Sequence, residues 1–594
     1  MCGIFFSIGF ENLSSQVIDC VTHRGPDGQG WKSFKSPHGS IVMAHRRLSI
    51  IDLSKDGHQP MSSQDCRYWI TYNGEIYNYL ELRKELEVQG VSFQTQTDTE
   101  VLLKSFIHWG TDCLNKLNGM FAFVIWDAKK KKAFIARDRF GVKPLYYYKQ
   151  GNKIAFASEI KQFTFLPRFK SLLNKEHFSY FLLNRHHPIT KTTCFKNVMH
   201  IEPGNFAEHE KEILTIKKWY DIEKVAQDNF YKFVSPESFK SLFLDSIKKR
   251  LIADVQTGAL LSGGLDSSSI VCSISDVLQS TSIKDQDIKT FTSYSPHPDV
   301  DESEFSDSVT NKTGIANIKS TIELDSLQGC IEKIIYHQEE PFISTSIHSE
   351  WNIYKTVKKH TNFKVVLDGQ GADELLCGYL FMVPHVLADM VKSHQYFNLV
   401  SELINIRKNH SNLSSKTLII DIMNQTCPSF LEKIQKIRKK NFTREQQFEN
   451  FYQYTLYLIR RSIEPQLRWQ DRSSMAFSIE SRQPFLDYRI VENLICVPTK
   501  QKFRQGITKV LLRESMRGVI PEKVRTRNSK FGFPSPQSAL LESIETKFFQ
   551  KYIKIGENII ESVLPNSLKL NNDAQKSCLK ITTGLWAEKF GVSS

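Results

Sequence analysis

The chain has 594 residues, of which 40% are hydrophobic and 24% charged, and its formal net charge is +14 at pH 7. This length exceeds one hydrophobic core, and the composition excludes a fibrous or disordered chain. No stretch approaches the roughly 20 consecutive apolar residues that cross a bilayer, and the start, MCGIFFSIGF, lacks the basic segment of a secretory signal. We therefore expect at least two domains, a cytoplasmic location and no membrane partner.

The positive charge does not indicate a nucleic-acid partner. The 78 basic residues are diluted by 64 acidic ones, and the densest basic run, Lys129–Lys132, lies between two apolar segments, as in an exposed hairpin turn. A phosphate-rich small substrate explains the basic balance equally well. The 11 cysteines include no Cys-x-x-Cys pair and no zinc-finger spacing, so we expect neither a disulfide framework nor a structural zinc site.

The first part of the chain, residues 2–210, predicts a sheet-rich α+β domain with layered sheets. Helical spacing occurs at Tyr79–Gln89 and at Glu100–Trp109. Alternating or continuous apolar runs, broken by Gly, Asn, Asp and charge clusters, predict strands. These runs are IFFSIG, SIVMAHRRLSII, YWITYNG, MFAFVIWD, KAFIARD and KIAFASE. Residues 211–235 are expected to be a connector.

From residue 236 to residue 594 the pattern changes to strands that alternate with helices. Apolar residues at helical spacing predict a helix that begins at Pro236. The runs VQTGALL, KTFTSYS and FKVVLDG predict strands, and a helix follows the first of them to about Leu278. This order is typical of an α/β doubly wound parallel sheet. The chain after about residue 385 is expected to be a helical C-terminal region.

Cys2 is the first candidate for chemistry. Removal of the initiator Met would leave a thiol and a free α-amine on one residue. An α-amine titrates near 7.7–8.0, so a useful fraction is unprotonated near neutral pH and can accept the thiol proton. One residue would then supply both the nucleophile and its base.

Cys2 is followed by a series of motifs in a fixed order. They are HRGPDGQG, HRRLSIIDLS, NGEIYN, QTDTE, GMFAFVIWD and RDRFGVKPLYY. Together with Cys2-Gly3-Ile4 they resemble the class II glutamine amidotransferase domain across residues 2–160. The resemblance implies an N-terminal nucleophile fold and hydrolysis of glutamine.

The same resemblance implies a role for each matching residue. Cys2 would be the nucleophile, and Arg47 would pair with the glutamine α-carboxylate, which suits a bidentate guanidinium. Asn73 and the Gly74 N–H would form the oxyanion hole, and Glu75 and Asp98 would hold the substrate amino group. Two plainer alternatives stay open: Arg47 as a surface charge, and Asn73-Gly74 as a type I′ hairpin turn.

A glycine-rich turn follows the first predicted strand of the second domain. In Ser262-Gly263-Gly264-Leu265-Asp266-Ser267-Ser268, backbone N–H groups, hydroxyls and a helix N-terminus can surround an anion. It lacks the lysine of a P-loop, which argues against γ-phosphate transfer, although a serine-rich helix cap is a simpler alternative. The turn resembles the pyrophosphate loop of the ATP pyrophosphatase group. The residues expected to bind ATP are Leu261, Ser262, Gly263, Gly264, Asp266, Ser267, Ser268, Asp368 and Gly369.

A second acidic loop, Leu367–Glu374, follows another predicted strand. By the resemblance, Asp266 and Asp373 would hold Mg²⁺, which prefers oxygen ligands. Gln370 and Asp373 would face the acceptor. Some asparagine-making relatives carry Glu at the position of Gln370.

Two downstream segments, Gln470–Asp487 and Arg527–Pro536, resemble the C-terminal signature of asparagine synthetases, and Lys530 matches a catalytic lysine that steadies the phosphates. The resemblance implies that glutamine, ATP and aspartate are substrates and that ammonia reaches a β-aspartyl-AMP through an internal tunnel. It also implies a homodimer. A tailoring amidotransferase that amidates a different carboxylate, such as a sugar acid or a peptide, remains an alternative.

Overall fold

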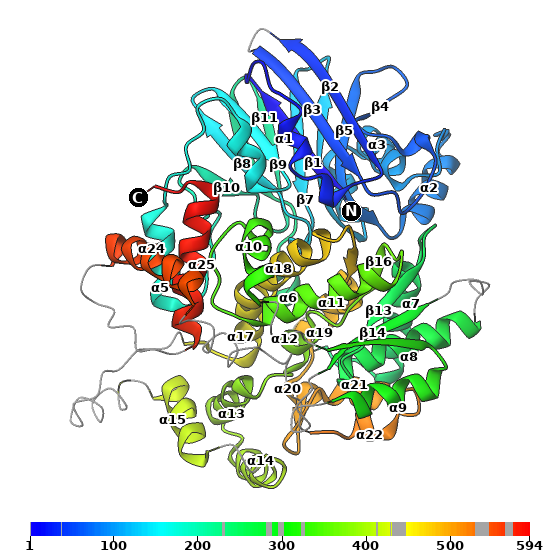
Figure 1. The fold of residues 1–594 in the computed structure, drawn as a ribbon. Coiled ribbons are helices and arrows are strands. Elements are labelled where there is room, and N and C mark those ends of the chain that lie inside the picture. Colours follow the sequence, from blue (N-terminus) through cyan, green and yellow to red (C-terminus); the bar gives the residue numbers. More distant parts are fainter. Residues whose placement is uncertain are drawn as a thin grey trace.

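A computed structural model gives the structure of the chain. It describes residues 2–36, 39–228, 232–280, 288–294, 302–321, 327–410, 414–427, 429, 447–528, 546–564 and 574–593. Figure 1 shows two regions: a strand-rich part formed by the first third of the chain, and an α/β part with the later helices.

The first region contains two antiparallel sheets. Among the described residues the first sheet has the order β10-β8-β9-β1-β3-β2 and the second the order β12-β11-β7-β6-β5-β4. The strands of the first sheet are β1 (Gly3–Ile8), β2 (Gly28–Ser36), β3 (Gly39–Arg47), β8 (Tyr146–Gln150), β9 (Lys153–Ala157) and β10 (Val198–His200). Those of the second are β4 (Met61–Ser62), β5 (Tyr68–Ile76), β6 (Gly119–Asp127), β7 (Lys132–Arg137), β11 (Asn205–Glu210) and β12 (Ile213–Lys218).

The two sheets pack face to face. A buried apolar layer between them takes side chains from β1, β3, β6, β7, β8 and β9, including Phe6 and Val124. Helices α2 (Tyr79–Val88) and α3 (Asp98–Trp109) cover the outer face of the second sheet. Helices α1 (Gln16–Asp19) and α5 (Lys175–Asn184) cover the outer face of the first. This four-layer arrangement is the expected layered α+β domain.

The second region contains a parallel sheet of order β15-β14-β13-β16-β17. Its strands are β13 (Thr257–Leu260), β14 (Lys289–Tyr294), β15 (Ala316–Thr321), β16 (Val365–Leu367) and β17 (Glu480–Arg482). On one face of the sheet pack α7 (Pro236–Arg250) and α8 (Leu265–Ser280), and on the other packs α11 (Ser346–His360). The sheet is therefore doubly wound, as expected.

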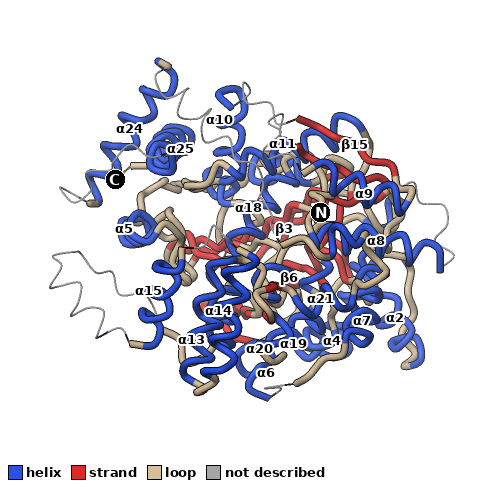
Figure 2. Tube along the Cα trace, turned by 90° about the horizontal axis from the view of Figure 1, so that it is seen from below, coloured by secondary structure: helices blue, strands red, loops and turns tan. Residues whose placement is uncertain are grey.

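The later part of the chain is helical, which was also expected. Its main helices are α12 (Ala372–Leu376), α13 (Val383–Lys392), α14 (Tyr396–Asn409), α15 (Ser415–Thr426), α17 (Phe451–Leu458), α18 (Glu464–Met475), α19 (Tyr488–Cys496), α21 (Val510–Ser515), α24 (Lys547–Val563) and α25 (Ala574–Phe590). Helices α24 and α25 return to the first region beside α5 (Figures 1 and 2), where Trp586 packs against Phe178.

One segment, Ala372–Lys392, is long and apolar enough to cross a membrane by composition alone, contrary to the expectation from the sequence. It is not one continuous α-helix. Helix α12 ends at Leu376, Cys377 takes a left-handed conformation with φ of 58°, and a 3₁₀ turn at Leu380–Met382 precedes α13. Side chains of α12 and α13 pack in apolar cores, and 56% of the most apolar window is buried. These features are typical of helices inside a domain.

The connector expected at residues 211–235 contains regular structure. Strand β12 pairs with β11 at the edge of the second sheet, and α6 (Ile222–Asp228) follows it. The apolar alternation of β12 was too short to be distinguished from a connector in the sequence. The Lys129–Lys132 run lies in the β6–β7 hairpin, with Lys129 and Lys130 exposed, as predicted.

Candidate active sites

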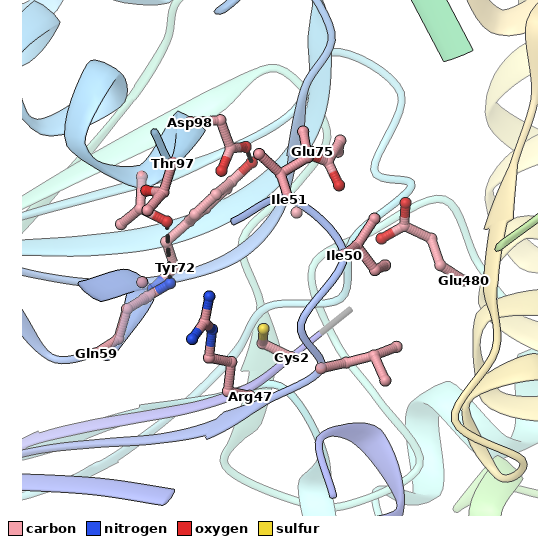
Figure 3. Close-up of a pocket in the computed structure, with 14 residues that line it drawn as sticks. Cys2, Arg47, Ile50, Ile51, Gln59, Tyr72, Glu75, Thr97, Asp98 and Glu480 are labelled. Atoms are coloured by element: carbon pink, nitrogen blue, oxygen red, sulfur yellow. Dashed lines mark hydrogen bonds between the residues drawn. The ribbon is translucent and has the colours of Figure 1, made fainter. Parts of the chain in front are cut away.

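Cys2 precedes β1 at the floor of a pocket between the two sheets (Figure 3). Its backbone N–H donates to Asn73 Oδ1 at 2.9 Å, and Arg24 Nε donates to its carbonyl at 3.0 Å. The residue is only 8% exposed. Burial raises the pKa of the Cys2 thiol above its ordinary value, because charge is costly away from water. The thiol therefore needs a nearby base to become a nucleophile.

Asn73 and Gly74 lie inside β5, where they pair with Ala122 and Phe121 of β6. The hairpin-turn alternative is therefore wrong. A Cβ on Gly74 would lie 2.1 Å from the Met120 carbonyl oxygen, so no side chain fits there. Asn73 Nδ2 is buried and has no hydrogen-bond partner among the described residues. A buried donor without a partner is costly, and this one adjoins Cys2, where an oxyanion would develop.

Glu75 and Asp98 lie on the side of the pocket opposite Arg47 and Cys2 in Figure 3. Burial, and then the charge of Asp98, raise the pKa of Glu75 well above its ordinary value. Burial raises the pKa of Asp98 to about 6, although hydrogen bonds from the Ile76 N–H and the Tyr72 hydroxyl oppose the shift. Two buried carboxyls facing one pocket would gain from a cationic ligand.

Arg47 ends β3 and forms part of the pocket wall, so it is not an isolated surface charge. Its guanidinium donates to the backbone carbonyls of Ser54, at 2.5 Å, and Asp52. Gly57 lies so close that a Cβ there would be 2.0 Å from Arg47 Nη2. These contacts hold the cation beside Cys2, on the side of the pocket opposite Glu75 and Asp98 (Figure 3).

The second region completes this pocket, which the sequence did not predict. Glu480 of β17 lines it, and Arg482 Nη2 binds Glu75 Oε2 at 3.0 Å. The segment Gln470–Asp487 was singled out in the sequence, but nothing in its pattern connects it with a residue more than 400 positions earlier.

The glycine-rich turn lies between β13 and α8, at the carboxyl end of the parallel strand. Gly263 has φ of 74°, and a Cβ there would approach Phe305 and Ser306 to 2.9 Å, so glycine is required. Ser262 and Ser267 hydroxyls lie 3.1 Å apart, and Ser262 Oγ accepts the Gly264 N–H. These bonds fix the turn. Residues of α9 (Ser303–Thr313) pack closely against the turn at Gly263.

Asp266 and Asp373 come together around a lysine that the sequence analysis missed. Lys509 Nζ lies 2.6 Å from Asp266 Oδ2 and 2.5 Å from Asp373 Oδ1. Lys509 precedes α21 in a left-handed conformation, φ 57°. No spacing pattern in the segment TKVLLRES distinguishes Lys509 from other lysines. Only the tertiary structure places its ammonium group against the two aspartates. Gly369 also lies here, with a Cβ position 3.1 Å from Asp266 Cβ.

The remaining residues of the acidic loop have their own partners. Asp368 accepts the Gln370 N–H at 2.9 Å, the Ser481 hydroxyl, and Gln483 Nε2 at 3.1 Å, so its carboxylate shapes the loop. Gln370 Nε2 donates to Gln466 Oε1.

Lys530, and the part of the Arg527–Pro536 motif from Ser529 onwards, lie outside the described residues.

The fold and these two sites define a class: a protein with a buried cysteine pocket in a layered α+β domain and a glycine-rich turn after a parallel strand of an α/β domain. Residues 1–220 match the glutamine amidotransferase domain, and residues 238–554 match asparagine synthase. The chain belongs to the asparagine synthase family and is a glutamine-dependent ligase.

The alignments with similar proteins cover most of both chains. An asparagine synthetase [glutamine-hydrolyzing] 1 of Bacillus subtilis is 31% identical over 89% of this chain and 84% of its own. The enzyme named asparagine synthetase [glutamine-hydrolyzing] 3 of the same organism is 29% identical over 95% and 91%. A relative with a different name, amidase chyE of Penicillium rubens, is 27% identical over 86% and 83%.

Proposed function

We propose that this chain is a glutamine-hydrolysing asparagine synthetase that forms asparagine, glutamate, AMP and pyrophosphate from aspartate, glutamine and ATP. The domain pair and the named relatives support this reaction. The tailoring alternative is not favoured, because both Bacillus subtilis relatives described above are named asparagine synthetases.

In the first half-reaction, Cys2 attacks the glutamine side-chain amide. Loss of Met1 leaves an α-amine that accepts the thiol proton and passes it to the departing ammonia. The free Asn73 Nδ2 and the Gly74 N–H stabilise the tetrahedral oxyanion. Arg47 binds the α-carboxylate, and Glu75 and Asp98 bind the α-ammonium group. Water then hydrolyses the γ-glutamyl thioester to release glutamate and restore Cys2.

In the second half-reaction, residues 261–268 with Asp368 and Gly369 bind ATP, and the aspartate β-carboxylate displaces pyrophosphate from the α-phosphate. Asp266 and Asp373 would hold Mg²⁺: their oxygens suit a hard ion, and Lys509 shows that a cation fits between them. When bound, Mg²⁺ would neutralise pyrophosphate charge. The ammonium group of Lys509 is then available to bind the phosphates. The resemblance assigned this role to Lys530. Gln370 would face the acceptor.

The observation that carries the proposal is the position of β17. Alternate residues of a strand point to opposite faces. Glu480 and Arg482 contact the Cys2 pocket, whereas Ser481 binds Asp368 of the acidic loop. One three-residue strand therefore adjoins both sites, and we expect ammonia released at Cys2 to pass beside it to the acyl-adenylate.

The test is pyrophosphate release by the purified protein with ATP, Mg²⁺ and glutamine, with and without aspartate, coupled to detection of asparagine. Pyrophosphate that depends on aspartate, with matching asparagine, is the expected result. Glutamate production without aspartate-dependent pyrophosphate would contradict aspartate as the acceptor and would favour another carboxylate.

A further inference from the structure

A compact group of metal-ligating side chains lies away from both sites. It consists of His177, His187, Cys194 and Glu340, whose ligand atoms all lie within 4.8 Å of one another. His177 belongs to α5, His187 and Cys194 to the chain that follows it, and Glu340 follows α10 (Leu327–Gln338) of the second region. The group thus bridges the two domains.

The two imidazoles are positioned as ligands. His177 Nε2 lies 3.0 Å from His187 Nδ1, so the two nitrogens need to separate by only about 0.3–0.8 Å to reach the roughly 3.3–3.8 Å between ligand atoms that bonds of about 2.0–2.3 Å to a tetrahedral zinc ion require. His177 Nδ1 contacts the Thr192 hydroxyl at 2.9 Å, an outer contact that fixes the ring.

Further contacts fix the other donors. Phe181 stacks on the His187 ring at 4.4 Å, and His187 Nε2 is buried with no hydrogen-bond partner among the described residues. Glu340 Oε1 accepts the Cys194 N–H at 2.5 Å, and its other oxygen pairs with Arg468. These two contacts hold the Glu340 carboxylate beside Cys194.

The donor set decides which ion fits. A thiolate with two imidazoles favours Zn²⁺, whereas Mg²⁺ prefers carboxylates and water. Four protein ligands leave no open position, which is typical of a structural rather than a catalytic zinc site. Binding would exchange the thiol proton of Cys194 for a zinc–sulfur bond and release that proton to solvent.

We propose that His177, His187, Cys194 and Glu340 form a structural zinc site that fastens the amidotransferase domain to the synthetase domain. Three ligands come from within 18 residues of one domain, and the fourth closes the site across the interface. The site is separate from the Cys2 pocket and the phosphate loop, so it does not depend on the proposed reaction.

The test uses the full chain with Cys2→Ala, which removes the other thiol expected to be reactive. We expect about one zinc per chain after desalting, and Co²⁺ in its place should give a thiolate charge-transfer band. Cys194→Ala should abolish that band, and His187→Gln should weaken zinc binding more than about 100-fold, beyond the usual cost of losing an outer-shell partner. A chelator should lower the Tm of the parent protein but not that of Cys194→Ala.

Matched controls are available in the same region. His186→Gln changes the neighbouring histidine, which contacts the His187 carbonyl instead of the group, and Cys330→Ala removes another buried cysteine. Both controls should retain zinc and the cobalt band. Parent protein without stoichiometric zinc or a cobalt–thiolate band would overturn the proposal, as would equal loss of zinc in His186→Gln and His187→Gln.

Discussion

The Cys2 pocket and the phosphate loop both contain a pair of acidic side chains, but the two pairs differ in their counter-ions. Asp98 accepts hydrogen bonds from two neutral donors, the Tyr72 hydroxyl and the Ile76 N–H, and Arg482 binds Glu75 from the side of the second domain. Asp266 and Asp373, in contrast, share the ammonium group of Lys509. The first pair therefore leaves Asp98 to gain by binding a cationic substrate group, whereas both carboxylates of the second pair already share the Lys509 cation.

The largest expected effect comes from Cys2→Ala. Glutamine-dependent asparagine formation should fall by at least about 10³-fold, because no other group replaces the nucleophile. Formation from added ammonium should persist, since the phosphate loop is a separate site. Both activities are measured by asparagine production. Loss of the ammonium-dependent reaction as well would show that the two sites are not separable.

Lys509→Met tests the cation of the second pair. Aspartate-dependent pyrophosphate release should fall by roughly 10²–10³-fold, the usual cost of losing one group that stabilises developing charge. Glutamate production measured without ATP should be unchanged. Lys530→Met, assayed in parallel, tests the lysine expected from the sequence. A normal rate of pyrophosphate release in Lys509→Met would show that Lys509 serves only as a structural counter-ion for the two aspartates.

The smallest effect is the pH dependence of the first pair. Asp98, with a pKa of about 6, is charged above that pH and protonated below it, so its attraction for the glutamine ammonium group is lost as pH falls through 6. At pH 5 the protonation of Asp98 lowers kcat/KM for glutamine hydrolysis about tenfold. This decrease adds to the one caused by protonation of the Cys2 α-amine, whose pKa is near 7.7–8.0.

A plot of log kcat/KM against pH should therefore have a slope near one between about pH 7.5 and 6 and near two below about pH 6. Asp98→Asn separates the two groups, because it should lower kcat/KM at neutral pH and leave a slope near one throughout. A second break at pH 6 in Asp98→Asn would assign that titration to another group.

Local sequence was sufficient where one short segment carries the information. The apolar alternation of β1, β5 and β6 and the glycine turn before α8 each depend on neighbours in the chain, so their structure was predictable. The motifs around Cys2, Arg47 and Asn73 likewise predicted residues that the structure brings into one pocket.

Other features were missed because their signal is too short or too distant. Strand β17 has three residues, and its role follows from contacts with Glu75 and Asp368, which lie more than 100 positions away. The expectation that no structural zinc site exists came from cysteine spacing alone. Cys194 has no cysteine partner, and its proposed fellow ligands include Glu340 of the other domain.

The sequence by itself therefore determined the two domain classes and the glycine turn before α8, because strand periodicity and turn chemistry act between residues close in the chain. Only the tertiary structure decided which charges meet: Lys509 with Asp266 and Asp373, Arg482 with Glu75, and Arg468 with Glu340. Such pairs form because burial makes an isolated charge costly, and the packing of whole domains selects the partner.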